Sequence, residues 1–249
     1  MRNIVLKIAY DGTDYHGFQR QLPENPSTIA IQNILEIKLQ KIFGDKIEIS
    51  AAGRTDSGVH ALGQVINFHT NGTIPVEKIP IAASNLLPKD IVVLDAWEAD
   101  SNFNARHSAK SKIYIYRILT GLVSNPFVNR YVWHIRYPLN FEAMSEALSI
   151  IVGKHDFSAF RASGGAPMSP IRTIFQADIN SEENSQLQIK IHANGFLYHM
   201  ARNIVGSLVA VGRGRFSVED FRKIFEGRDR NKAAPTAPPQ GLCLYEVFY

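Results

Sequence analysis

Two patterns of apolar residues alternate along the chain: short runs with period-two spacing, and longer stretches with apolar residues three or four positions apart. The first pattern predicts β-strands and the second predicts amphipathic helices. Strands are predicted at residues 4–10, 47–50, 64–68, 90–97, 113–119, 171–174, 187–192 and 242–248. Helices are predicted at residues 31–42, 76–87, 141–152 and 217–227, and a further one is entered within residues 194–206. This mixture predicts an α+β fold.

The ends of the predicted helices carry their own signals. Ser27 or Thr28 is expected to cap the first helix, and Pro88 is expected to stop the second. Gly153 closes the third helix, and Ser217 begins the helix at 217–227. The apolar stripe of the first helix is expected in the core and consists of Ile31, Ile34, Leu35, Leu39 and Ile42.

The stretch 51–61, which reads AAGRTDSGVHA, concentrates polar groups between two predicted strands. Its glycines predict a turn, so the polar cluster lies at the bend of a hairpin. If the backbone is extended near Asp56, Arg54 and Asp56 point to the same face, and the guanidinium favours the ionised carboxylate. Thr-Asp-Ser alone would be an ordinary turn. However, no turn requires Arg54, Asp56 and His60 together.

Residues 53–61 resemble the GRTDxGVHA signature of the TruA-type tRNA pseudouridine synthases. The resemblance implies that Asp56 is the catalytic nucleophile. Further family-like segments follow in the right order over nearly the whole chain. They are YDGTDYHGFQRQ (10–21, with Phe18 where tryptophan is common), FNARHSAKSKIYIYRI (103–118), HDFSAFR (155–161), ANGFLYHMARNIVG (193–206, with Ala201 replacing the usual valine) and APPQGLCL (237–244).

Several residues are expected to bind the RNA substrate. The resemblance implies that Tyr114 contacts the target base, an aromatic face against a uracil, whereas Tyr116 is assigned to the core. His60 of the signature is expected in the same site, and His199 is expected to form a phosphate-facing pair with Arg202, three residues later. The basic residues expected to contact phosphates are Arg20, Arg106, Lys110, Arg161, Arg172 and Arg202.

Composition changes this interpretation little. Hydrophobic residues make up 45% and charged residues 20% of the 249, as in an ordinary soluble globular protein. A net charge of +4 is weak support for a polyanionic partner. The single cysteine, Cys243, rules out an internal disulfide framework and a multi-cysteine zinc site. With no leader-like start and no apolar run long enough to cross a bilayer, a cytoplasmic location is expected.

The reaction implied by the resemblance breaks the N1–C1′ bond of uridine, rotates the uracil and rejoins it through C5. The atoms are conserved overall, so no redox partner, nucleotide or metal is needed. The sequence accordingly has no GxGxxG, Walker or HExxH motif. Asp56 is expected to attack either C6 of the base or C1′ of the ribose, and the sequence leaves both open.

The resemblance also implies an architecture and a substrate. The expected fold is the pseudouridine-synthase fold, in which two RRM-like α/β halves, 1–100 and 101–249, join in a mixed, mainly antiparallel sheet with a central cleft. The expected substrate is the anticodon stem-loop of tRNA at positions 38–40, bound by a homodimer whose subunits share each RNA. The glycine- and proline-rich stretch 162–170 is predicted to be an irregular loop, and the sequence does not say whether it contacts RNA.

Two other classes of protein fit parts of the pattern. A non-catalytic RNA-binding module of paired RRM-like units would suit the aromatic-rich strands, but no clear RNP1 octamer is present. A small glycoside hydrolase would also use a nucleophilic aspartate, but it needs a second carboxylic acid that the signature stretch does not offer.

Overall fold

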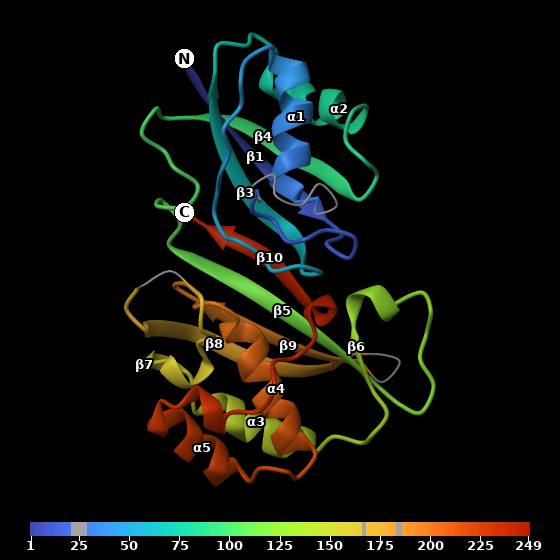
Figure 1. The fold of residues 1–249 in the computed structure, drawn as a ribbon, viewed down its shortest axis with the longest axis vertical. Helices are drawn as coiled ribbons and strands as arrows, with labels where there is room; N and C mark the ends of the chain where they lie inside the picture. Colours follow the sequence, from blue (N-terminus) through green and yellow to red (C-terminus); the bar gives the residue numbers. More distant parts are fainter. Residues whose placement is uncertain (21–28, 166–167, 183–185) are drawn as a thin grey trace. The chain divides into compact units, whose positions relative to one another are not determined.

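The computed structural model describes residues 1–20, 29–165, 168–182 and 186–249. The chain forms two compact units, residues 1–110 with 243–249 and residues 111–242 (Figure 1). Each unit combines a mainly antiparallel sheet with helices, so the predicted α+β class is confirmed. The division into 1–100 and 101–249 stays a prediction about the domains.

The first unit contains a sheet with the strand order β4-β1-β3-β10. Strand β1 pairs antiparallel with both β3 and β4, β10 runs parallel to β3, and the short β2 pairs antiparallel with β3. The elements are β1 (Arg2–Tyr10), α1 (Ile31–Phe43), β2 (Ser50–Ala51), β3 (His60–Thr70), α2 (Ile79–Ser84), β4 (Ile91–Ala99) and β10 (Leu242–Phe248).

Both faces of this sheet are covered near its centre. Ile4, Leu6 and Ile8 of β1 are fully buried, and so is the apolar stripe of α1 at Ile31, Leu35 and Leu39. Helix α1 lies across the sheet in Figure 1. The alternate residues of the strands form a second cluster that includes Val5 and Val65, against which Phe103 and Tyr249 pack. Strands β1 and β3 therefore contribute buried side chains from both faces.

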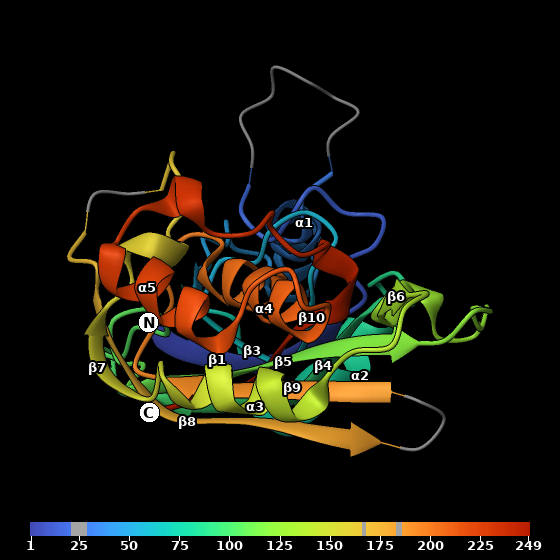
Figure 2. The ribbon, with the colours of Figure 1, turned by 90° about the horizontal axis from the view of Figure 1, so that it is seen from below.

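The second unit contains a sheet with the order β5-β9-β8-β7, and β6 pairs parallel with β5. Helices α3, α4 and α5 pack against one another, and α3 also contacts β8. Figure 2 shows α4 and α5 on one side of β8 and β9. The elements are β5 (Ser111–Thr120), β6 (Trp133–Ile135), α3 (Phe141–Ser149), β7 (Gly153–Asp156), β8 (Ile171–Glu182), β9 (Gln186–Ala193), α4 (Met200–Gly212) and α5 (Val218–Gly227).

Most predicted elements are present, but several have different bounds. The strand predicted at 171–174 extends to Glu182, and the strand predicted at 64–68 spans His60–Thr70. Residues 47–49 are not in a strand, and only Ser50–Ala51 pairs with β3. The predicted helix 76–87 is a 3-10 turn, Val76–Lys78, followed by the six-residue α2, after which the N–H groups of residues 86 and 87 both donate to the Ala83 carbonyl. Helix α3 ends at Ser149, before the predicted residue 152.

The helix caps match the predictions only in part. Ser217 begins α5 as its N-cap, as the sequence predicts. It accepts a hydrogen bond from the Asp220 N–H and forms a capping box with that residue. Residues 27 and 28, the expected cap of α1, lie outside the described residues. The N-cap of α1 is Ala30, which has no side chain to cap the helix. Among the described residues, no helix is long and apolar enough to cross a membrane.

Candidate active site

The signature segment forms a tight turn between β2 and β3. The Val59 N–H donates to the Asp56 carbonyl at 3.1 Å, and Gly58, the third residue of this turn, has a φ of 75°. Glycine adopts this left-handed conformation without steric strain. Asp56 is half-buried and Arg54 is exposed, so solvent reaches this end of the turn. The Asp56 carboxylate is therefore not sealed in the apolar interior.

The loop after β1, residues 11–18, packs on this turn. The Phe18 N–H donates to the Thr55 carbonyl at 3.0 Å, next to Asp56 in the chain. The Tyr15 carbonyl accepts from the Gly58 N–H at 3.3 Å and from the Ser57 hydroxyl at 3.1 Å. These bonds lie on both sides of Asp56, so the loop fixes the backbone that carries the carboxylate.

The same loop also begins helix α1. Ala30 offers no side-chain cap, and the carbonyls of Gly17 and Phe18 accept instead from the Ile31 and Gln32 N–H groups, at 3.2 and 2.9 Å. The first N–H groups of a helix need such acceptors. Loop 11–18 therefore connects the start of α1 to the Asp56 turn.

His60 is buried at the first position of β3. Its Nδ1 accepts from the Gly12 N–H at 3.0 Å and lies 3.1 Å from Oδ1 of Asp11. Because the Gly12 N–H can only donate, the first contact fits a neutral imidazole with its proton on Nε2, whereas the second fits a protonated ring. In both states the ring anchors residues 11 and 12. Its part in substrate binding stays a proposal.

Arg54 lies in the field of a second arginine. Partial burial of its guanidinium lowers the pKa of Arg54, and the charge of Arg106 lowers it further. Arg106 is exposed, and its backbone N–H donates to Oδ1 of Asn104 at 3.0 Å. Arginine stays ionised in proteins, so Arg54 and Arg106 give the first unit two positive charges that interact with each other. Arg54 lies two residues before Asp56 in the chain. The predicted pairing of Arg54 with Asp56 stays a prediction.

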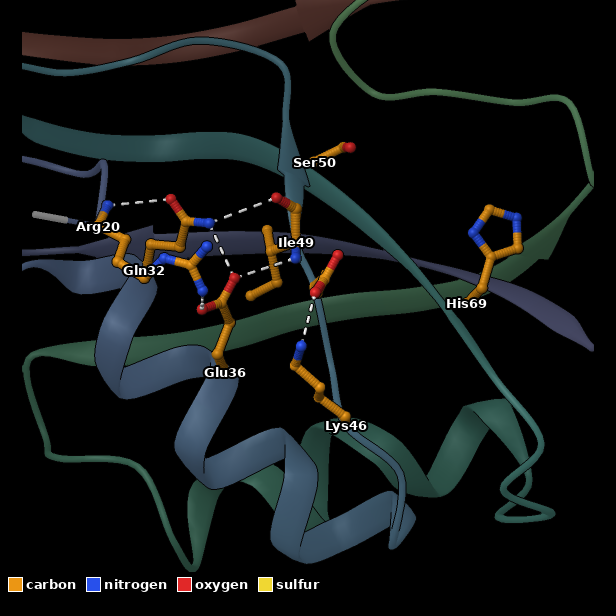
Figure 3. Close-up of a pocket in the computed structure, with 8 residues that line it drawn as sticks. Arg20, Gln32, Glu36, Lys46, Ile49, Ser50 and His69 are labelled. Atoms are coloured by element: carbon orange, nitrogen blue, oxygen red, sulfur yellow. Dashed lines mark hydrogen bonds and ion pairs between the residues drawn. The ribbon is translucent and has the colours of Figure 1, made fainter. Parts of the chain in front are cut away.

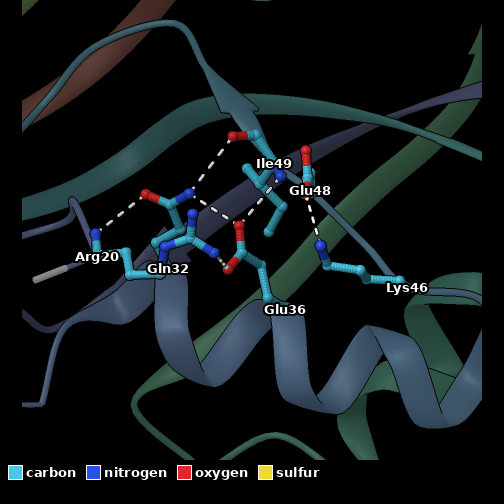
Figure 4. A network of polar contacts seen from close by, with 6 residues as sticks. All are labelled: Arg20, Gln32, Glu36, Lys46, Glu48 and Ile49. Atoms are coloured by element: carbon cyan, nitrogen blue, oxygen red, sulfur yellow. Dashed lines mark hydrogen bonds and ion pairs between the residues drawn. The ribbon is translucent and has the colours of Figure 1, made fainter. Parts of the chain in front are cut away.

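Arg20 lines a polar pocket of about 460 Å³ beside α1 (Figure 3). Its Nη1 lies 3.2 Å from Glu36 Oε2, and the Arg20 side chain is 54% exposed while that of Glu36 is only 11% exposed. The other Glu36 oxygen accepts from Gln32 Nε2 at 2.8 Å and from the Ile49 N–H at 3.1 Å (Figure 4). Glu36 thus holds one side of the Arg20 guanidinium, while much of the side chain faces solvent.

In the second unit, the two tyrosines of β5 have different surroundings. Tyr116 is in the core, as predicted: it is 2% exposed and its hydroxyl donates to the Pro238 carbonyl at 2.7 Å. Tyr114 is 8% exposed, and its ring meets Phe196 edge to face, with centroids 4.7 Å apart. The contact of Tyr114 with a target base stays a proposal.

Arg161 and Arg172 hold the same irregular loop. Arg161 Nη1 donates to the Met168 carbonyl at 3.2 Å, and Arg172 Nη1 donates to the Ser169 carbonyl at 2.8 Å. Burial lowers the pKa of Arg172, and the charge of Arg161 lowers it further. These two predicted phosphate ligands therefore form one positively charged patch of the second unit.

His199 and Arg202 do not share a helix face. Helix α4 begins at Met200, and His199 is its N-cap with a φ of 58°, so the geometry of residues three apart in a helix does not apply. Arg202 Nε donates to the Ala237 carbonyl at 2.8 Å, and the Ala237 N–H donates to the Arg202 carbonyl at 3.1 Å. Arg202 thus ties α4 to the segment that precedes β10.

Cys243, the single cysteine of the sequence, is buried. Throughout the ranges that the structure describes, no group of three or more His, Cys, Asp or Glu side chains lies where it could hold a metal ion.

The sequence gives no prediction for three buried residues beneath the turn, Tyr10, Thr55 and Gln64. The Tyr10 hydroxyl lies 2.7 Å from Thr55 Oγ1, and Gln64 Nε2 donates to the Gly53 carbonyl at 2.8 Å. The sequence signal for Gln64 is that its amide stands, with that of Asn67, in a mainly apolar stretch, because a buried amide needs partners.

A family model described as tRNA pseudouridine synthase matches residues 7–108 and 147–249. The chain belongs to the tRNA pseudouridine synthase family. It is 46% identical to tRNA pseudouridine synthase A of Thermoanaerobacter sp. (strain X514) over 249 residues, which covers 100% of both chains. It is also 44% identical, again over 100% of both chains, to the protein of that name from Caldicellulosiruptor saccharolyticus. The family and the fold predicted from the signature are therefore confirmed.

Gly17 tests the contact between loop 11–18 and the Asp56 turn. Its φ is 83°, and an added Cβ would lie 2.8 Å from the Thr55 carbonyl oxygen. We expect Gly17→Ala to cost about 1–2 kcal/mol for the left-handed backbone and more for the displaced turn. Turnover should fall about tenfold or more, because small displacements of a reacting group are costly.

The matched control is Gly214→Ala, at a φ of 70° with no atom within 4 Å of an added Cβ. This variant should lose only the stability that the left-handed backbone costs, measured by thermal unfolding, and it should turn over normally. Equal stability and turnover in the two variants would contradict the proposed role of the close contact.

Proposed function

We propose that this chain isomerises uridine to pseudouridine at positions 38–40 of the tRNA anticodon stem-loop, with Asp56 as the nucleophile. Isomerisation of uridine in tRNA is the reaction of the family to which the chain belongs. The assignment of Asp56 as the nucleophile is supported above all by one observation. Asp56 lies half-buried in a turn that loop 11–18 holds by hydrogen bonds on both sides of it.

The chemistry requires one group that forms and then releases a covalent bond. A carboxylate oxygen of Asp56 adds to C6 of the uracil or displaces the base from C1′, the N1–C1′ bond breaks, and C5 then bonds to C1′. The Asp56 bond breaks again and the proton on C5 is lost, while N1 gains one. Substrate and product are isomers, so the proposed reaction requires no cofactor.

The target nucleotide must leave the helical stack before the aspartate reaches it. Extraction of a base costs a few kcal/mol, which replacement contacts must offset. We assign Arg54 to the opened stem and Tyr114 to the target base. The phosphate contacts are assigned to the exposed or half-exposed cations, Arg20, Arg106, Lys110, Arg161, Arg172 and Arg202, with His60 and His199 as further substrate ligands.

A homodimer, which the family resemblance implies, and a cytoplasmic location, which is expected from the sequence, complete the proposal. The two alternatives from the sequence are disfavoured. The chain belongs to a family of enzymes, which disfavours a non-catalytic RNA-binding module. A glycoside hydrolase would need a second catalytic acid, which the signature stretch does not offer.

Asp56→Ala and Asp56→Asn should abolish isomerisation, by at least about 10³-fold, because no other group would form the covalent bond. The measurement is tritium release from tRNA that carries 5-tritiated uridine, since C5 loses its hydrogen in the reaction. Binding of tRNA should survive in both variants. Asp95→Asn, an exposed carboxylate on β4, is the control and should turn over normally. Turnover in either Asp56 variant would reject the nucleophile.

Arg54→Lys should lose most of the activity, because an ammonium group cannot replace the planar fork of a guanidinium. Single-turnover rate constants at saturating enzyme are the measurement. The same exchange at the exposed Arg222 of α5 is the control and should have no effect. A near-normal rate for Arg54→Lys would remove Arg54 from the mechanism.

The substrate assignment is tested with tritiated transcripts that differ only in the anticodon stem-loop. Replacement of every uridine at positions 38–40 by cytidine should eliminate tritium release, while uridines elsewhere in the tRNA are unchanged. Release that persists from this transcript would show that the enzyme acts at another site in tRNA.

A further inference from the structure

A buried polar network lies beneath the Asp56 turn. The Tyr10 hydroxyl, at the end of β1, lies 2.7 Å from Thr55 Oγ1 and 3.5 Å from Gln64 Nε2. The Gln64 amide pairs with both backbone groups of Gly53: Nε2 donates to the carbonyl at 2.8 Å, and Oε1 accepts from the N–H at 3.3 Å. We call Tyr10, Thr55 and Gln64 the Tyr10 network.

Because this network is buried, loss of one of its hydrogen bonds would be costly in free energy. Gln64 is 0% exposed, Tyr10 4% and Thr55 5%. An amide or hydroxyl buried without a partner costs free energy, and apolar residues could fill the same space without that risk. Fully bonded polar groups in a core specify one arrangement of the groups around them. The arrangement specified here is that of residues 53 and 55.

We propose that Tyr10 and Gln64 are positioning residues for Asp56, acting through Thr55 and Gly53. The inference rests on the proposed role of Asp56 as the nucleophile. Gln64 holds both backbone groups of Gly53, and Tyr10 holds the side chain of Thr55.

These bonds act together with the contact from the loop. The Thr55 carbonyl accepts from the Phe18 N–H at 3.0 Å. Thr55 is therefore held from two directions, by its hydroxyl from below and by its carbonyl from loop 11–18. The residue immediately before Asp56 has little freedom to rotate, and this sets the direction in which the carboxylate leaves the chain.

The network keeps one protonation state at neutral pH. Burial raises the pKa of Tyr10 well above its usual value, against the opposing effect of its hydrogen bonds to Thr55 and Gln64. The hydroxyl therefore stays protonated and remains a donor. Tyr10 thus offers the turn a neutral hydroxyl.

The test compares the hydroxyls of Tyr10 and Thr55. Tyr10→Phe and Thr55→Val each remove one partner of the 2.7 Å bond at nearly constant volume. We expect single-turnover rate constants for 5-tritiated tRNA to fall roughly 10- to 100-fold, since a misplaced reacting group loses rate steeply. The dissociation constant for tRNA should stay within about twofold. Thr55→Ser keeps the hydroxyl and should restore the rate to within about threefold of the unsubstituted enzyme.

The double variant Tyr10→Phe/Thr55→Val separates positioning from stability. With both hydroxyls gone, no unpaired hydroxyl remains between the two residues, so the melting temperature should recover toward that of the unsubstituted enzyme. The rate should stay as low as in the slower single variant, because both changes remove the same bond. Recovery of the rate together with the melting temperature would overturn the proposal.

Thr70→Val, on β3, the strand that follows the Thr55 turn, is the matched control. Thr70 is also fully buried, and its hydroxyl donates to Asp45 Oδ2 at 2.7 Å, at the opposite end of β3 from His60. It should lower the melting temperature and leave the rate unchanged. A rate loss equal to that of Thr55→Val would show that general destabilisation suffices, and would also overturn the proposal.

Asp56→Ala, assayed in parallel, distinguishes this proposal from the proposed function. If Asp56→Ala turns over, the nucleophile is wrong and the network has no catalytic group to position. If Asp56→Ala is inactive while Tyr10→Phe and Thr55→Val react at the normal rate, only the positioning role fails.

Discussion

The arrangement of the first unit depends on the close approach of two backbones, at residues 11–18 and 53–60. Phe18 and Tyr15 bond to the turn on both sides of Asp56, and Gly17 allows the contact because any side chain there would collide with the Thr55 carbonyl. The same residues provide the acceptors for the start of α1, whose Ala30 cannot cap it. One loop thus serves a helix and a candidate nucleophile together.

Below that contact, the turn rests on polar groups set in an apolar sheet. Tyr10 and Gln64 come from the two paired central strands β1 and β3, and both faces of these strands are covered. A buried hydrogen bond is costly to break and leaves few alternative geometries. The candidate site therefore combines a half-buried carboxylate with a hydrogen-bonded network beneath it. Such preorganisation of a reacting group favours catalysis.

Local patterns predicted much of this structure. The period-two runs predicted β1 ending at Tyr10 and β10 at its observed bounds, and the glycines predicted the turn that carries Asp56. The errors lie where tertiary contacts decide. The carbonyls of Gly17 and Phe18 accept the first N–H groups of α1. The sequence near the helix start does not indicate that these acceptors come from loop 11–18. His199 lies outside α4 because its backbone is left-handed, a conformation that sequence spacing does not reveal. The partners of Gln64 depend on the register between strands, which a single sequence leaves open.

Strand β10 shows that the order of the chain is not the order of the fold. It follows the whole second unit in sequence, yet Cys243 and Leu244 pair with His60 and Ala61 at the start of β3, directly after the Asp56 turn. During synthesis, the nascent first unit would therefore emerge from the ribosome with an open sheet edge beside its signature. That edge closes only when the polypeptide beyond residue 242 has been made, so a prematurely terminated product would lack the strand that pairs with the start of β3.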